Sequence, residues 1–257
     1  MNSIDVNCDV GEIAAMVADG SQARLLRYVS SANIACGEHA GNAEMMRATI
    51  EQAQAAGATI GAHPGYEDPE NFGRVELHLT HEDIAASVHR QILALDQIAD
   101  SLGTRILHVK PHGALYNQAA RDANIAGAIA EGVARWNSDV ILVGLAGSVM
   151  LAEFRKAKFR VAAEAFADRR YEGDGSLRSR KFDDAMLQTP EEAAAQALSI
   201  VQKGCVLSRD GQVVLIQADT ICIHGDTPGA LQTAQAIDKA LNAARITRKR
   251  LMLYESR

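Results

Sequence analysis

Short apolar runs alternate with longer segments of helical periodicity along the whole chain. In the longer segments apolar residues recur at three- and four-residue steps, which predicts amphipathic helices. Strands alternating with such helices are typical of a parallel sheet with right-handed crossovers. The apolar runs predict strands at the following positions, of which the last could be two strands: Ser3–Asp9, Ser31–Cys36, Thr59–His63, Arg105–Val109, Val140–Gly144, Arg160–Glu164 and Val213–Ile223.

Residues with capping chemistry mark the starts of three predicted helices. Thr80 and Asp83 form a variant of the capping box ahead of the periodic segment Glu82–Leu102. Thr189-Pro190-Glu191-Glu192 places N-cap, first-turn proline and acidic residues in the order that begins a helix. Asp226-Thr227-Pro228 predicts the start of the last helix in the same way.

No Pro- or Ser-rich linker and no change of composition divides residues 1–257, so we predict a single domain. About seven strands fit a closed or slightly open barrel better than a doubly wound sheet. A chain of this length can bury a full core without disulfides or structural metals.

Composition excludes several classes of protein. The chain has 257 residues, 47% of them apolar, and a net charge of −6, which argues against a nucleic-acid-binding surface. No apolar run is long enough to span a bilayer, and no apolar core of a signal peptide precedes Asp5. Four widely spaced cysteines without a CxxC pair predict a reduced, cytoplasmic protein. One local basic cluster predicts a solvated face or substrate contacts: Arg169, Arg170, Arg178, Arg180 and Lys181.

Ionisable residues gather where predicted strands end. The C-terminal ends of parallel strands meet on one face of an α/β fold, and that face holds the active site. Asp9 and Glu12 follow the first strand. Five of the eight histidines also lie at strand ends: His39, His63, His108, His112 and His224.

The fourth strand runs into an unusual sequence of alternating basic residues. His108, Lys110 and His112 fall on one side of an extended segment, and Pro111 favours extension at the lysine. A lysine inside a barrel mouth must either bind an anion or be paired. Lys110 could therefore stabilise an oxyanion or a phosphate, which we favour, or pair with Asp9.

Two further kinds of site are compatible with these residues. Asp9, His63 and His112 could bind a divalent metal, with His39 or Glu38 as a further ligand, or the histidines could act as acids and bases. Glycine-containing turns at 144–148 and 224–229 could hold phosphate at a helix N-terminus, although neither matches a known nucleotide fingerprint.

The motifs together resemble the LamB/YcsF family. The resemblance runs from about residue 4 to about 243 and rests on Asn7–Glu12, Ser31–Gly37, Gly61–Tyr66, Phe72–Arg74, His108–Tyr116, Ala165–Tyr171 and Ala218–Gly229. It implies an irregular seven-stranded parallel (β/α) barrel, TIM-like and akin to the glycoside hydrolase and deacetylase barrels. It also implies the activity of an A subunit of 5-oxoprolinase. Such a protein works with the B and C subunits to open the lactam 5-oxo-L-proline to L-glutamate at the expense of ATP.

On this hypothesis each candidate residue has a role. Asp9 or Glu12 would be the general base, His63 and His112 would carry protons or bind metal, and Lys110 would hold the phosphate or oxyanion. The substrate would contact His39, Arg74, Tyr116, Asp168 and Arg169, with Arg169 on its carboxylate. Phosphate or nucleotide would contact Gly147, Ser148, His224, Gly225, Asp226 and Thr227.

Two other functions stay open. A metal-dependent amidohydrolase or deacetylase would use Asp9, His63 and His112 on another lactam or amide without ATP. A non-catalytic scaffolding subunit would only bind partner proteins, although such a role has no need of converging ionisable groups.

Overall fold

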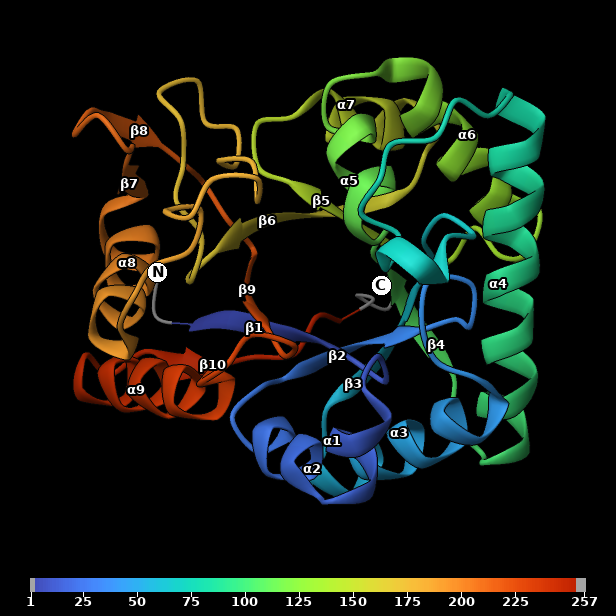
Figure 1. Ribbon diagram of the computed structural model, residues 1–257, viewed down its shortest axis with the longest axis horizontal. Helices are drawn as coiled ribbons and strands as arrows, with labels where there is room; N and C mark the ends of the chain where they lie inside the picture. The colour runs from blue at the N-terminus through green and yellow to red at the C-terminus, as the bar shows by residue number, and fades with distance from the viewer. Residues whose placement is uncertain (1–2, 253–257) are drawn as a thin grey trace, which may run out of the picture.

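The computed structural model describes residues 3–252, and seven parallel strands close into a barrel at its centre (Figure 1). The strand order is β1-β2-β3-β4-β5-β6-β9, and β9 pairs with β1 to complete the ring. A short strand, β10 (Thr247–Arg248), pairs with the start of β1. The predicted seven-stranded parallel barrel is confirmed. The barrel strands are β1 (Ser3–Val10), β2 (Ser31–Ala35), β3 (Thr59–His63), β4 (Ile106–Val109), β5 (Ile141–Leu145), β6 (Arg160–Phe166) and β9 (Thr220–His224).

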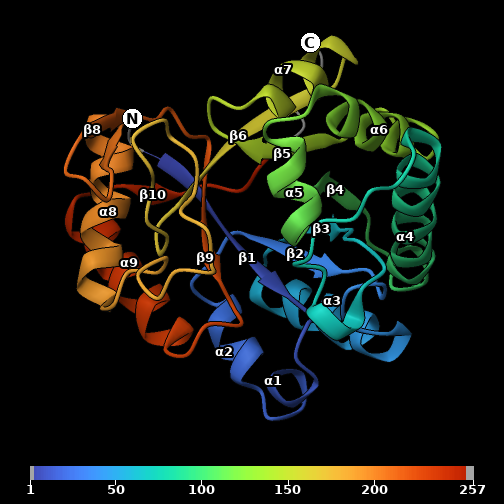
Figure 2. The ribbon, with the colours of Figure 1, turned by 45° about the horizontal axis from the view of Figure 1, so that its top comes forward.

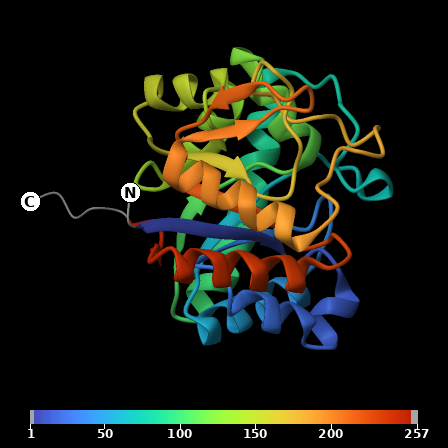
Figure 3. The same cartoon turned by 90° about the vertical axis from the view of Figure 1, so that its left-hand side faces the viewer.

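Helices surround the barrel (Figure 2). α4 packs against α6 on one side, and α8 lies along α9 on another (Figure 3). The helices are α1 (Ala14–Ala18), α2 (Ser21–Leu26), α3 (Ala43–Ala56), α4 (His81–Ser101), α5 (Gly113–Ala119), α6 (Ala123–Ala134), α7 (Val149–Lys156), α8 (Pro190–Lys203) and α9 (Ala230–Ala243), with a 3₁₀ turn at Pro69–Asn71. None of the helices within residues 3–252 is both long and apolar enough to cross a lipid bilayer.

Capping residues account for where the predicted helices begin. The Thr80 hydroxyl accepts a hydrogen bond from the Asp83 backbone N–H at the start of α4. At the start of α8, Thr189 and Glu192 form a complete capping box. The predicted start of the last helix at Asp226-Thr227-Pro228 is wrong. α9 begins at Ala230, because the Asp226 carboxylate pairs with Arg74 instead of capping a helix.

The predicted strand Val213–Ile223 divides into two strands. β8 (Val213–Leu215) leaves the barrel and pairs antiparallel with β7 (Cys205–Leu207), whereas β9 joins the barrel. Asp219 separates the two, and its carboxylate accepts a hydrogen bond from the Ala163 backbone N–H. The chain therefore turns at Asp219 to enter the barrel beside β6.

Polar side chains fill much of the barrel interior, while the apolar core lies between the strands and the helices. The buried polar groups bond to one another, which offsets the cost of removing them from water. Asn33, for example, donates from Nδ2 to Asn7 and to Asp9, and its Oδ1 accepts from His108. Hydrogen bonds of this kind hold the polar side chains of the interior in fixed positions.

The buried side chain of Asp5 is expected to make the stability of the protein depend on pH. Its carboxylate, 2% exposed, accepts hydrogen bonds from Ser30, Ser31 and Thr220, yet burial raises its pKa from 3.8 to about 6. A carboxyl group with a raised pKa stabilises the folded state below its unfolded pKa, and this contribution disappears as pH rises through the folded pKa. The free energy of unfolding should fall by about 3 kcal/mol between about pH 4 and pH 7 from this group.

Denaturant unfolding at several pH values tests this expectation. Asp5→Asn should remove that part of the pH dependence, while Asp100→Asn, an exposed position on α4, should leave it unchanged. Equal pH dependence in wild type and Asp5→Asn would contradict the assignment.

Candidate active site

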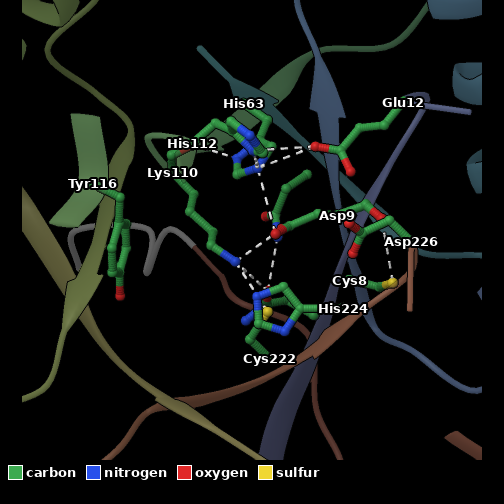
Figure 4. Close-up of polar contacts among 12 residues, drawn as sticks. Cys8, Asp9, Glu12, His63, Lys110, His112, Tyr116, Cys222, His224 and Asp226 are labelled. Carbon is green, nitrogen blue, oxygen red and sulfur yellow. Dashed lines mark hydrogen bonds and ion pairs between the residues drawn. The ribbon is translucent and has the colours of Figure 1, made fainter. Parts of the chain in front are cut away.

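Lys110 lies in the barrel interior, directly after β4 (Figure 4). Its Nζ is 2.8 Å from Oδ1 of Asp9, 3.0 Å from Oε1 of Glu164 and 3.0 Å from Sγ of Cys222. The residue is 2% exposed. Of the two roles that the sequence allows, the ion pair with Asp9 is therefore present. Lys110 also lines the large pocket described below, so an additional role toward an anion stays a prediction.

The Asp9–Lys110 pair is ionised. Burial opposes the charge on Asp9, but His63 and Lys110 outweigh it and hold the pKa of this carboxyl well below its usual range. Burial also opposes the charge on Lys110, but Asp9, Cys222 and Glu164 raise its pKa well above the usual value. A carboxylate with such a low pKa is a weak proton acceptor. The geometry therefore favours Asp9 as an electrostatic and positioning group over Asp9 as a general base.

Glu12 and three histidines form a second group, here called the Glu12–histidine cluster: Glu12, His39, His63 and His112. Oε1 of Glu12 is 3.2 Å from His39 Nε2, 3.8 Å from His63 Nε2 and 3.1 Å from His112 Nδ1. Burial opposes the charge on Glu12, but His112 and His39 hold its pKa well below the usual value. Burial, followed by His112, lowers the pKa of His39 to about 4. Glu12 is thus a carboxylate among imidazoles.

A pocket of about 1120 Å³ opens over these two groups at the C-terminal ends of the strands. Lys110, Asp9, His63 and His112 line its inner part. Further out it has a predominantly basic wall: Arg74, Arg121, Arg169, Arg180 and Lys181. A cleft with this excess of positive charge attracts anionic ligands.

The predicted substrate residues divide between the pocket wall and the layer behind it. Arg74, Tyr116 and Arg169 line the pocket. Asp168 lies behind, where its carboxylate accepts hydrogen bonds from the backbone N–H of His224 at 2.9 Å and faces His224 Nδ1 at 3.0 Å. His39, the remaining predicted substrate residue, packs in the Glu12–histidine cluster with its ring 3.8 Å from that of His112.

The two predicted phosphate turns differ in their surroundings. Gly147 and Ser148 line the pocket at the start of α7, where the positive end of the helix dipole favours an anion, although the backbone N–H groups of Ser148 and Val149 already donate to the carbonyls of Leu145 and Ala120. His224 also lines the pocket. Gly225, Asp226 and Thr227 lie outside its lining, and Asp226 is held by Arg74. The described geometry therefore favours the turn before α7 for an anion.

Comparison with known proteins decides the family. The model of the LamB/YcsF family matches residues 4–255. The chain belongs to the LamB/YcsF family. The resemblance predicted from the motifs is therefore confirmed.

Relatives of this LamB/YcsF chain cover almost its whole length. It is 49% identical to the A subunit of 5-oxoprolinase from Chloroflexus aggregans over 96% of this chain and 98% of that protein. It is 46% identical to the A subunit of 5-oxoprolinase from Bordetella pertussis, over 93% and 95% respectively. The crystal structure of the lactam utilization protein from Thermus thermophilus matches with a TM-score of 0.90 and 40% identity, covering 97% of this chain and 100% of that one.

Two residues of this LamB/YcsF site were outside the set predicted from sequence. Glu164 pairs with Lys110 and also accepts a hydrogen bond from the Tyr116 hydroxyl at 2.7 Å. Cys222 places its sulfur against the Lys110 ammonium. Both lie on barrel strands at the level of the site, and the position of Glu164 beside a strand end was the available signal. The residues that contact a buried lysine come from other strands, so they can be identified only from the closed barrel.

Glu38 has no part in the Glu12–histidine cluster of this family member. Its carboxylate accepts a hydrogen bond from Nε of Arg90 at 2.9 Å and another from the Ser87 hydroxyl at 2.8 Å. Both partners lie on α4, so Glu38 joins the loop after β2 to that helix. The sequence-based option of Glu38 as a further metal ligand does not fit this arrangement.

Proposed function

We propose that this chain provides the site at which 5-oxo-L-proline is opened to L-glutamate in an ATP-dependent reaction with partner subunits B and C. The observation that carries the proposal is Lys110, a buried cation at the inner end of a large, basic pocket. Two relatives named as A subunits of 5-oxoprolinase, 49% and 46% identical over nearly the whole chain, support the choice of substrate.

The lactam requires activation because an amide in a five-membered ring is a poor electrophile. Transfer of the γ-phosphoryl group of ATP to the lactam oxygen would supply it, with ADP as the leaving group. In the hydrolysis that follows, one water would add to the activated carbon and the ring C–N bond would break to give an acyl phosphate of glutamate. A second water would cleave this acyl phosphate to leave glutamate and inorganic phosphate. Positioning and charge stabilisation dominate both steps.

The pocket offers a group for each charge in this reaction. The Lys110 ammonium stabilises the negative charge that develops on the lactam oxygen, and Asp9 and Glu164 hold it in place. Arg169 binds the substrate carboxylate, since a guanidinium binds carboxylates in a bidentate manner. Gly147 and Ser148 at the start of α7 contact the phosphoryl group. His63 and His112 lie beside the reacting carbon, where they carry protons or hold a metal.

Reconstitution tests the proposal. This chain with cognate B and C subunits should release glutamate from 5-oxoproline only when ATP is present, and omission of this chain should abolish release. Hydrolysis of a lactam or amide without ATP would favour the metal-dependent hydrolase instead. Full activity in complexes that carry Asp9→Asn or His112→Gln would favour a scaffolding role.

A further inference from the structure

We propose that Glu12, His63 and His112 form a binding site for one divalent transition-metal ion, with His39 adjacent as a fourth ligand. The proposal concerns metal binding and stands whether or not the pocket opens a lactam. The sequence suggested Asp9 as the carboxylate ligand, and its Oδ2 does lie 3.4 Å from His63 Nε2. We choose Glu12 instead because Asp9 is already paired with Lys110, whereas Oε1 of Glu12 faces both His112 and His63.

The hydrogen bonds of two histidines define where their protons lie. Nδ1 of His63 is 2.7 Å from the backbone carbonyl oxygen of Lys110, and Nε2 of His112 is 2.8 Å from that of Phe72. A carbonyl oxygen only accepts, so each of these nitrogens carries a proton and donates it. Metal-binding histidines are typically held in this way, with the second ring N–H bonded to a carbonyl or carboxylate.

The opposite nitrogens of the same rings point at one another. His63 Nε2 and His112 Nδ1 are 3.0 Å apart, and in neutral imidazoles both carry lone pairs. Oε1 of Glu12 lies 3.1 Å from the His112 nitrogen. Three electron-rich atoms so close repel one another unless a cation lies between them. A single proton can satisfy one pair of these atoms, whereas a divalent metal satisfies all three.

The spacing of these atoms suits a small metal ion. A tetrahedral ion with bonds of 2.0–2.1 Å separates its ligand atoms by about 3.4 Å. The three separations in the cluster are 3.0, 3.1 and 3.8 Å. Imidazole nitrogens with one carboxylate suit zinc or cobalt(II) better than magnesium or calcium, which prefer oxygen ligands.

His39 is the least constrained member of the cluster. Its Nε2 is 3.2 Å from Glu12 Oε1, but its ring is stacked on that of His112 with an interplanar angle of 5°. Rotation of the ring out of this stack would bring Nε2 toward the metal. Its Nδ1 is buried without a hydrogen-bond partner among the described residues, so no second contact fixes the ring. His39 is thus expected to contribute less affinity than His63.

A second group of possible metal ligands consists of Asp9, Cys222 and His224. Two of its members already contact the positively charged side chain of Lys110. The Lys110 ammonium lies 2.8 Å from Asp9 Oδ1 and 3.0 Å from Cys222 Sγ. In contrast, the ion-pair partners of Glu12 within residues 3–252 are all histidines. The Glu12–histidine cluster is therefore the group that takes a metal.

Metal titration of the full chain without a histidine tag tests the site. After treatment with a chelator, the protein should bind one Zn²⁺ or Co²⁺ per chain, measured by calorimetry and by metal analysis after gel filtration. The Co²⁺ form should show visible absorption of a tetrahedral site without sulfur-to-cobalt charge transfer, since its ligands are nitrogen and oxygen. A charge-transfer band would assign the metal to the Cys222 group and overturn the proposal.

Variants separate the ligands from other histidines. Glu12→Gln and His63→Gln should each weaken Zn²⁺ binding by about 100-fold or more, and His39→Gln by about 10-fold. His81→Gln, at an exposed residue that pairs with Glu131, is the matched control and should bind zinc as the wild type does. Circular dichroism and thermal unfolding verify that each variant is folded. Absence of stoichiometric metal in the folded wild type, or unchanged affinity in folded Glu12→Gln and His63→Gln, would overturn the proposal.

Metal binding is measured without substrate, so its outcome is independent of the lactam assay. A chain that binds zinc but releases no glutamate would refute the proposed reaction and leave the metal site intact. A chain that releases glutamate and binds no metal would refute the metal site and support the proposed reaction.

Discussion

Lys110→Met is expected to lower turnover by about 100- to 1,000-fold, as loss of one group that stabilises an oxyanion does. Methionine retains most of the volume of lysine but has no charge for the developing oxyanion. The same change leaves Asp9 and Glu164 buried without their shared cation. Removal of one partner from a buried ion pair costs about 3–5 kcal/mol, so the variant should also be less stable. Glutamate release by the reconstituted complex and denaturant unfolding measure the two effects separately.

A double variant distinguishes a chemical role of Lys110 from a structural one. Glu164→Gln removes one of the two unpaired charges and retains an acceptor for Asn7. Lys110→Met combined with Glu164→Gln should therefore regain part of the lost stability without regaining turnover. Recovery of turnover together with stability would show that Lys110 acts only by maintaining the fold.

Gly61→Ala is expected to destabilise the barrel by about 3 kcal/mol, because overpacking a rigid interior is costly. Gly61 lies opposite His108 where β3 pairs with β4. A Cβ atom at position 61 would lie 2.1 Å from Nε2 of His108, a ring that is fully buried. That ring cannot move aside without breaking its hydrogen bond to Asn33. Thermal and denaturant unfolding of the purified chain measure the effect.

Gly127→Ala is the matched control for this change. Gly127 lies in α6, and a Cβ there meets only His81 at an ordinary contact distance of 3.6 Å. Alanine should stabilise that helix by about 0.5–1 kcal/mol. Adding His108→Ala to Gly61→Ala should cost less than the sum of the single changes, since the clash is removed. Additive effects, or a Gly61→Ala variant as stable as wild type, would contradict this explanation.

Local patterns in the sequence were sufficient to predict alternating strands and helices, whereas the closed barrel was favoured by the number of strands and implied by the resemblance to the LamB/YcsF family. Apolar runs, helical periodicity and capping residues act over a few positions, so they locate strands and helix starts such as those at Thr80 and Thr189. The same local information places Asp9, Lys110 and His112 at strand ends. Parallel strands bring such ends to one face, which is why convergence on one pocket could be expected before any coordinates.

The partners of those side chains depend on closure of the barrel. Lys110 meets Glu164 because the closed sheet places the ends of β4 and β6 on either side of β5, with both side chains in the barrel interior. No local pattern in the sequence encodes this contact. Glu38 follows a strand end as closely as His39 does, yet it binds Arg90 on α4 while His39 enters the cluster.

Backbone periodicity and capping are local, so they were enough to predict the secondary structure and most of the residues at the mouth of the barrel, but not Glu164 and Cys222. The pairing of these residues depends on the closed barrel, in which Lys110 takes Oδ1 of Asp9, His63 lies 3.4 Å from Oδ2 of Asp9, and Glu12 lies among the histidines. These ion pairs and ligand sets form over a few ångströms between residues about 30 to 100 positions apart, and strand register and side-chain length decide which of them meet.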